Sequence, residues 1–290
     1  MTAKPNRSAG EGLERSCDER SDWFRGTPPV EGVERLEAWF SGRAYETHRH
    51  DTYAIAVTDA GVQSFDYRGS VVNSTVGNVV VLHPDEAHDG RAGTEEGFGY
   101  RILYVEPARI GVAASLLAGR ACALPFAVEA VSHSGKLASA VNAAFRHDLE
   151  PLAVDSLILQ LADGLMDADP SCRQGGTTAR LDTTAVDRAR QFLDAETNRV
   201  VRSSELEAVT GLTRYDLARQ FKSRVGTSPY RYSMMRRLDT ARRQVRTDRS
   251  LADIALGAGF ADQAHFTRKF KAAYGVTPAR YATLQANGRQ

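Results

Sequence analysis

The sequence predicts an α+β protein of several domains: an N-terminal β-barrel, a helical segment behind it, and an all-α C-terminal domain. Three observations support this fold class. Short β-rich runs divided by Gly, Asp and Asn fill residues 39–107, helical periodicity begins after Pro107, and one helical motif occurs twice in the last third of the chain. A chain of 290 residues is long enough for two domains that each bury a core.

The N-terminal part of the chain divides into a polar tail and the predicted barrel. Residues 1–22 are rich in Gly, Ser and charge and are predicted to be disordered. Residues 23–107 carry runs such as YAIAVTDAG, NVVVLHP and YRILYVEP, and short strands at close spacing are typical of a sandwich or small barrel. No apolar run approaches the roughly 20 residues that span a bilayer, and the N-terminus lacks the apolar stretch of a signal peptide. We therefore expect a cytoplasmic protein with no membrane partner.

Residues 108–168 carry two stripes of apolar side chains with a helical period, one from Leu137 to Phe145 and one from Leu157 to Leu165. Such stripes pack either inside their own domain or against a second subunit. We assign this range to a helical segment for coupling or dimerisation. The next residues, 169–181, contain Pro, Gly and Thr without an apolar period, which predicts a linker to the C-terminal domain at 182–290.

Charge is divided unevenly along the chain. Residues 1–180 hold 17 Lys and Arg against 25 Asp and Glu, whereas residues 181–290 hold 20 against 11. The formal net charge of the C-terminal domain is therefore +9, although the whole chain carries only +1. A positive charge concentrated in one predicted domain favours a polyanionic partner.

The basic domain contains one motif twice. RYDLARQFKSRVGTSPYRY, from Arg214, and QAHFTRKFKAAYGVTPARY, from Gln263, align at a constant offset of 49 residues. Each copy has a short helix, a glycine turn and a second helix that begins at a capping residue, which is Thr213 in one copy and Asp262 in the other. This is the plan of a helix-turn-helix, and its duplication makes an ordinary helical bundle a much weaker explanation.

The second helix of each copy is predicted to bury an apolar face and to expose a basic one. The outward positions are Tyr215, Ala218, Arg219 and Lys222 in the first copy and Ala264, Thr267, Arg268 and Lys271 in the second. Between the copies, about 18 residues from Pro229 have a helical pattern and would form a rod of about 27 Å. That length is close to the roughly 34 Å repeat of DNA, so one chain is predicted to read two successive major grooves.

The duplicated domain resembles the AraC/XylS family of transcription regulators over residues 182–284. The stretch GFADQAHFTRKFKAAYGVTPARY is close to the family signature. The resemblance implies base-reading positions at Arg214, Tyr215, Ala218 and Arg219 in the first helix and at Gln263, Ala264, Thr267 and Arg268 in the second. The chemistry agrees, because Arg suits guanine, Gln suits adenine and the Thr methyl can touch thymine. Lys222, Lys271 and the arginines of the linking helix are expected to contact phosphate. Glu207 departs from the family, which usually has Ala there.

The N-terminal barrel resembles the cupin-like sensor domains that are fused to such modules, over residues 35–107. The stretches HRHDTYAIAVTDAG and GNVVVLHPDEAHDG carry this resemblance. Metal-binding cupins use a His-x-His pair, a nearby Glu and a later His, whereas here no Glu follows the pair. Asp51 is expected to point to the opposite strand face from its neighbour His50.

Three interpretations of the histidines remain open. They contact an organic effector, which we favour, or they hold a metal, or they are core or rim residues. The predicted effector-binding residues are His48, His50, Tyr53 and His88, with no metal and no cofactor assigned.

These features favour a transcription regulator in which a small effector shifts the arrangement of two domains or of a dimer. The alternatives are a metal-dependent cupin enzyme and a DNA-binding regulator that ignores ligands. The sequence offers no Ser, His and Asp set, no phosphate-binding glycine loop and no acid/base pair, so no catalytic residue is predicted. The expected partners are double-stranded promoter DNA, a small-molecule effector, a second copy of the chain and RNA polymerase.

Overall fold

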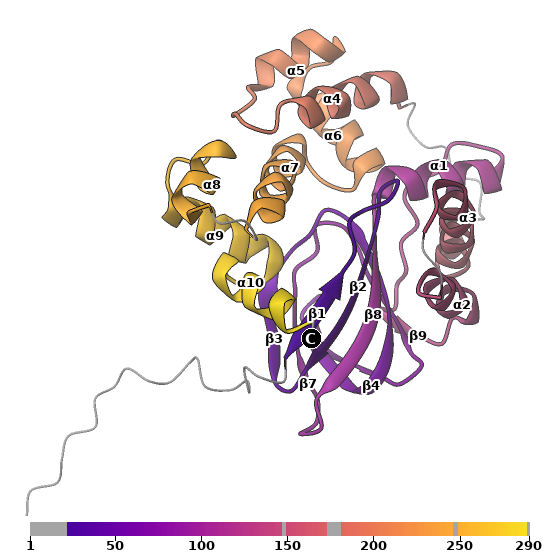
Figure 1. The fold of residues 1–290 in the computed structure, drawn as a ribbon. Coiled ribbons are helices and arrows are strands. Elements are labelled where there is room, and N and C mark those ends of the chain that lie inside the picture. Colours follow the sequence, from indigo (N-terminus) through magenta and orange to yellow (C-terminus); the bar gives the residue numbers. More distant parts are fainter. Residues whose placement is uncertain (1–21, 147–148, 173–180, 246–248, 289–290) are drawn as a thin grey trace, which may run out of the picture.

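The computed structural model describes residues 22–146, 149–172, 181–245 and 249–288 (Figure 1). Strands dominate the first third of the described chain and helices the remainder, so the predicted α+β class is confirmed. The predicted disordered tail, apart from Asp22, and residues 173–180 of the predicted linker lie outside the described residues. Within these ranges, every helix is too short or too polar to cross a bilayer.

The N-terminal domain is an antiparallel sheet with two branches that share strand β4. One branch has the order β1-β2-β8-β4-β6-β9; in the other, β5 and β7 both pair with the second half of β4, and β3 pairs with β7. The strands are β1 (Trp23–Gly26), β2 (Val33–Phe40), β3 (Arg43–His48), β4 (Tyr53–Tyr67), β5 (Ser70–Thr75), β6 (Val79–Leu82), β7 (His88–Ala92), β8 (Phe98–Val105) and β9 (Val131–Ser132).

The described strands of the predicted cupin-like barrel form an open sheet whose edges do not close. Strand β4 explains this shape. Its 15 residues run through both branches, and its pairing with β8 shifts register between Thr58 and Ala60. Such an irregularity bends a strand and lets one sheet fold over on itself without its edges meeting.

The first branch is buried on both faces. Because side chains alternate along a strand, Ile55 and Val57 face one core while Ala54 and Ala56 face the other, toward the second branch. This double burial explains the unbroken apolar run at the start of β4. The helices over the outer face are α1 (Pro107–Ala118), α2 (Gly135–Ala144) and α3 (Pro151–Asp167), and a short 3-10 helix follows at Pro170–Cys172.

Both predicted helical stripes belong to this outer core. Leu137, Val141, Leu161 and Leu165 are fully buried there. The stripes therefore pack inside the domain rather than against a second subunit, which was the other alternative. Leu152, on another side of α3, is exposed.

In the described ranges 181–245 and 249–288, the C-terminal region forms seven helices and has the predicted duplication. The two helix-turn-helix units are α5–α6 and α8–α9, and α7 joins them over 16 residues, which is about 24 Å. Thr213 and Asp262 cap α6 and α9 as predicted, and Pro229 opens α7. The helices are α4 (Thr183–Ala195), α5 (Ser203–Thr210), α6 (Arg214–Val225), α7 (Pro229–Gln244), α8 (Leu251–Gly257), α9 (Gln263–Tyr274) and α10 (Pro278–Asn287).

The two helix-turn-helix units differ in how they attach to the sheet. The first unit has a core of its own with α4, built around Val186, Leu217 and Phe221. The second unit shares one continuous core with the sheet. In this core the ring of Tyr281 packs against Phe24 of the sheet on one side and against Phe270 on the other. Figure 1 accordingly shows α10 against β1, with α4 and α5 farther from the sheet.

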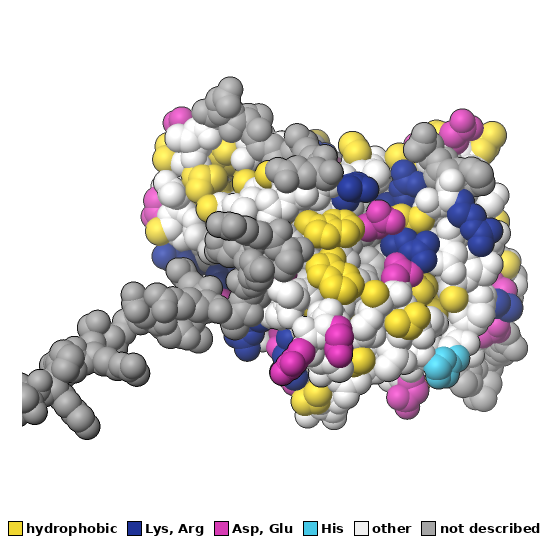
Figure 2. Space-filling view, turned by 60° about the horizontal axis from the view of Figure 1, so that its bottom comes forward, with side chains coloured by type: hydrophobic (Ala, Val, Ile, Leu, Met, Phe, Trp, Pro, Cys, Tyr) yellow, Lys and Arg dark blue, Asp and Glu magenta, His cyan; other side chains and the backbone are white. Residues whose placement is uncertain are grey.

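Charged side chains are mixed on the face that Figure 2 shows, where Lys and Arg lie close to Asp and Glu around a few hydrophobic side chains. On this face, therefore, the acidic N-terminal and basic C-terminal parts of the sequence do not form separate acidic and basic surfaces. Basic residues of the C-terminal helices also form ion pairs with acidic residues of the N-terminal domain.

Candidate functional site

Helix α6 presents its predicted base-reading positions to solvent. Arg214, Tyr215 and Arg219 are exposed, and Tyr215 is 79% accessible, whereas Leu217 and Phe221 lie in the core. Ala218 is half-buried and Lys222 is exposed. The predicted separation into an apolar and a basic face is therefore observed.

The N-terminus of α6 is fixed by two side chains. Thr213 Oγ1 accepts a hydrogen bond from the backbone N–H of Asp216 at 3.2 Å. Glu207, the departure from the family pattern, accepts a second bond from the backbone N–H of Arg214 at 2.8 Å. Carboxylates are favourable at helix N-termini, so Glu207 stabilises the start of the recognition helix.

Helix α9 presents a similar surface at its N-terminal half but not at its C-terminal half. Gln263, Ala264 and Arg268 are exposed and Thr267 is half-buried. Lys271, which was expected to contact phosphate, forms an ion pair with Glu46 of β3, with Nζ 2.8 Å from the carboxylate. In this arrangement a lysine of the second recognition helix is paired with the N-terminal domain and not with DNA.

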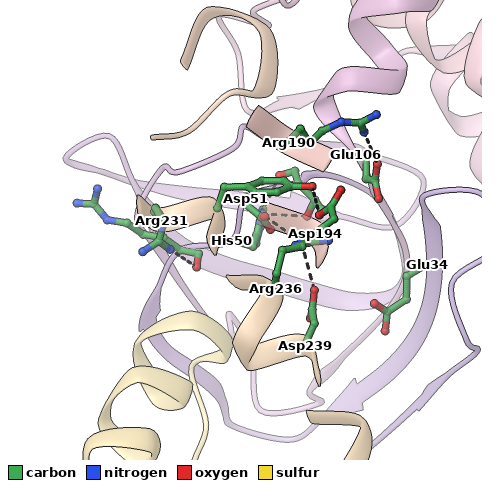
Figure 3. Close-up of polar contacts among 12 residues, drawn as sticks. Glu34, His50, Asp51, Glu106, Arg190, Asp194, Arg231, Arg236 and Asp239 are labelled. Carbon is green, nitrogen blue, oxygen red and sulfur yellow. Dashed lines mark hydrogen bonds and ion pairs between the residues drawn. The ribbon is translucent and has the colours of Figure 1, made fainter. Parts of the chain in front are cut away.

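Arg231, Arg236 and Arg242 of α7 contact the N-terminal domain, and the expectation that arginines of this helix contact phosphate stays a prediction. The three ion pairs are Arg231 with Asp85 at 2.6 Å, Arg236 with Asp51 at 2.9 Å and Arg242 with Glu34 at 2.7 Å. Figure 3 shows Arg236 between Asp51 and Asp239. The same helix buries Met235 and Leu238 in the shared core, and this packing turns its arginines toward the sheet.

A cavity of about 100 Å³ lies between the two domains. The N-terminal domain contributes His48, His50 and Tyr104 to its wall, and the C-terminal helices contribute Arg236 of α7 and Tyr274 of α9. The site therefore includes residues from distant parts of the sequence that sequence analysis did not group together.

Three of the predicted effector residues form one cluster. The ring centroids of His48 and His88 are 4.3 Å apart, and those of His50 and His88 are 4.8 Å apart. The pairing of β3 with β7 places His48 directly opposite His88. His48 and His50 line the cavity, and the ring of His88 contacts both of them.

Each of these imidazoles donates from Nδ1 to a backbone carbonyl two residues away. The acceptors are the carbonyl oxygens of Glu46 at 2.9 Å for His48, Thr52 at 2.8 Å for His50, and Glu86 at 3.1 Å for His88. A carbonyl can only accept, so Nδ1 carries the proton and Nε2 holds a lone pair. Nε2 of His50 is buried and has no hydrogen-bond partner.

Burial keeps the three imidazoles neutral. It lowers the pKa of His48 to about 4 and that of His50 to about 3, and it lowers the pKa of His88 well below its usual value. The neighbouring imidazoles lower the pKa of His50 and His88 further. At neutral pH the cluster is a set of uncharged hydrogen-bond acceptors.

The cluster does not fit the metal centre of a cupin. Among the residues that the structure describes, no three His, Cys, Asp or Glu side chains have the arrangement that a metal ion needs. Glu86, the carboxylate next to the His88 strand, pairs with Arg68 at 2.8 Å and also hydrogen-bonds Tyr67. Its carboxylate is therefore engaged elsewhere and does not join the imidazoles as a fourth metal ligand.

Two family models match the chain. A model described as an AraC-like ligand binding domain matches residues 31–162, and a model described as a helix-turn-helix domain matches residues 206–283. The chain belongs to the AraC family of transcription regulators. The matched ranges contain the sheet with its histidine cluster and both helix-turn-helix units.

Curated relatives of this AraC-family chain are transcription regulators. The chain is 27% identical over 261 residues to the HTH-type transcriptional activator RhaS of Yersinia pestis bv. Antiqua (strain Angola), which covers 84% of this chain and 91% of RhaS. It is 28% identical to the probable transcriptional regulator LumQ of Photobacterium leiognathi and 35% identical to the HTH-type transcriptional regulator MtrA of Neisseria gonorrhoeae. These two matches span only 40% and 26% of the relatives' lengths.

Solved structures share the two-domain fold of this AraC-family chain. ToxT from Vibrio cholerae matches with a TM-score of 0.59 and 14% identity over 90% of this chain and 98% of ToxT. ToxT with a bound unsaturated fatty acid matches with a TM-score of 0.55 and 15% identity over 91% of this chain and 96% of that one. At such low identity the likeness shows the fold.

Two residues differ from their predicted places. Tyr53 lies in the outer core with its hydroxyl donating to the carbonyl of Pro125 at 2.7 Å, so the structure does not bring it to the histidine cavity. Asp51 lines the cavity beside His50 instead of pointing away. Strand β3 ends at His48, so the alternation of side chains assumed for Asp51 does not continue that far.

Proposed function

We propose that this AraC-family regulator senses a small molecule in the cavity between its domains and transmits binding to α6 and α9 on promoter DNA. The observation that carries the proposal is the shared wall of the cavity, to which His50 belongs on one side and Arg236 on the other. A ligand that contacts both domains has a different affinity for each arrangement of the domains, which is what a regulatory shift requires. Gel-shift assays with DNA upstream of its own and neighbouring genes test this function; the absence of salt-sensitive, sequence-preferring binding would reject it.

We infer sensing rather than catalysis at this cavity. The arginines and carboxylates around it are joined in ion pairs, and the imidazoles are oriented by backbone carbonyls. A metal-dependent cupin enzyme would instead be supported by stoichiometric iron, nickel or zinc that is lost on His48→Ala, together with turnover of a small substrate.

We further propose that the protein acts in the cytoplasm as a homodimer that contacts RNA polymerase on the promoter. Exposed apolar side chains on the helices behind the sheet support a dimer surface, and they include Leu116, Leu117, Leu152 and Leu159. The relatives' role as transcription regulators supports the remaining partners.

Replacing Arg268 with Ala is expected to weaken binding to the operator by roughly 1–3 kcal/mol and to relax discrimination at one base pair. Arg268 is exposed on α9 at a position that implies contact with a base edge. Fluorescence anisotropy with operator duplexes mutated one base pair at a time measures both effects. Lys136→Ala on α2 is the matched control, because Lys136 pairs with Asp163 and Asp167 far along the chain from the recognition helices. Equal affinity of Arg268→Ala and the control would mean that the assumed base-reading register is wrong.

Replacing Glu46 with Gln is expected to strengthen DNA binding by up to about fivefold, because Lys271 becomes free to contact phosphate. The effect is small since both side chains of this ion pair are partly exposed, at 41% and 51%. The dependence of affinity on salt should become steeper as one more phosphate contact forms. Glu95→Gln, an exposed acidic residue of the β7–β8 loop, is the control. An unchanged salt dependence would show that Lys271 does not contact DNA.

A further inference from the structure

The polar end of the interdomain cavity combines a buried acceptor with buried donors. His50 is 6% exposed, and its Nε2 has a lone pair and no partner. Arg236 and Arg242 also line the cavity. The Nε–H of Arg236 is buried without a hydrogen-bond partner, whereas Nε of Arg242 lies 3.5 Å from the Asp239 carboxylate in an ion pair. Unsatisfied buried polar groups are costly, so a molecule that supplies both a donor and an acceptor would be stabilised here.

The charges around the cavity leave no cation free for an acidic ligand. Arg236 pairs with Asp51 and Asp239, and Arg242 pairs with Glu34. Three carboxylates therefore surround two guanidinium groups, and the imidazoles are neutral. A carboxylate ligand can only accept hydrogen bonds, so it would leave His50 Nε2 unpaired and would meet a net negative charge.

The other end of the cavity is apolar and small. Phe24, Leu36, Met235 and Val276 line it. A volume of about 100 Å³ is somewhat below that of an engineered cavity of about 150 Å³ that admits benzene. Its ligand is therefore no larger than about one ring with a polar substituent.

We propose that this cavity binds a small uncharged molecule that carries a hydroxyl group on an apolar, ring-sized body. The hydroxyl donates to His50 Nε2 and accepts from a guanidinium Nε–H of α7, because a hydroxyl can do both. The ligand thereby joins the segment after β3 to the helix that links the two recognition units. This inference deepens the proposed function, on which it rests.

Three probes separate the hydroxyl from the shape and from the charge: phenol, toluene and benzoate. Ligand-observed NMR with the full chain is expected to show binding of phenol near about 1 mM, with toluene and benzoate at least about tenfold weaker. His50→Leu should abolish the preference for phenol over toluene, since it removes the acceptor. Val276→Phe, which fills the apolar end, should weaken both phenol and toluene without altering the histidine.

His133→Leu, at an exposed histidine after β9, is the matched control and should bind phenol as the native chain does. Thermal unfolding confirms that each variant is folded. The proposal is overturned if benzoate binds as tightly as phenol, if toluene does, or if none of the three binds at about 10 mM. It is also overturned if neither cavity variant changes phenol binding.

The same experiment distinguishes a wrong ligand class from a wrong function. If benzoate binds and His50→Leu or Val276→Phe removes that binding, the cavity is the sensor and only the chemical class is wrong. If the probes bind as proposed but the chain binds no operator DNA, the ligand class is right and the regulatory function is rejected.

Discussion

Lowering the pH from 6.5 to about 5 is expected to reduce the free energy of unfolding by up to about 5 kcal/mol through the histidine cluster alone. Burial lowers the pKa of His48, His50 and His88 in the folded chain, whereas the unfolded chain takes up protons near pH 6.5. The unfolded state therefore binds more protons below that pH. This stabilisation is complete above pH 6.5 and is lost as the pH falls toward the folded-state values.

The groups that face the cluster modify the size of this effect but not its sign. Asp89 raises the pKa of His48, and Arg231 lowers the pKa of both His48 and His50. His83, outside the cluster, contributes a similar acid sensitivity, because burial lowers its pKa to about 4.

Urea unfolding at about pH 7 and about pH 5 measures this dependence. A variant with Gln at His48, His50 and His88 should lose most of the difference between the two pH values, even if it is less stable at both. His133→Gln, at an exposed position, should retain it. An equally steep dependence in the triple variant would mean that the cluster is charged in the folded protein.

The helix-turn-helix units could be predicted in detail because their signals are local. A capping residue acts on backbone N–H groups within its own first turn, so Thr213 and Asp262 fix the starts of α6 and α9 wherever these helices pack. The apolar spacing that buries Phe221 and Phe270 is likewise a property of a single helix.

The candidate effector site could be predicted only in part, because most of its wall is assembled by tertiary packing. The His-x-His spacing and a later His indicated a cluster, and strand pairing brings these residues together. Arg236 and Arg242 carry no sequence signal that separates an interdomain ion pair from a phosphate contact, since both need an arginine on a helix surface. That the sheet stays open could not be predicted for the same reason. The bend within β4 depends on tertiary pairing with two sets of partner strands.

Replacing Arg236 with Met is expected to destabilise the protein by about 3–5 kcal/mol, because it leaves a buried carboxylate without its partner. Asp51 is 4% exposed and Arg236 is 19% exposed, and their ion pair has an N···O distance of 2.9 Å. Burial already raises the pKa of Asp51, and Arg236 opposes that rise. Without the guanidinium the pKa of Asp51 should rise further, so the penalty should shrink as the pH falls and Asp51 takes up a proton. Chemical unfolding at several pH values measures it, and Arg243→Met, an exposed arginine on the same helix, should change stability little.

The double variant Arg236→Met with Asp51→Asn separates the charge penalty from the loss of packing. If the cost comes from an unpaired buried charge, the neutral amide should restore a large part of the stability lost in Arg236→Met, and this coupling should exceed that of distant pairs. If the double variant is as unstable as the sum of the single variants, the guanidinium stabilises the interface through packing against Tyr232, whose ring centroid lies 4.9 Å from it. Because Asp51 belongs to the N-terminal domain and Arg236 to α7, a restored double variant would show that this charge pair joins the sensor domain to the DNA-binding domain.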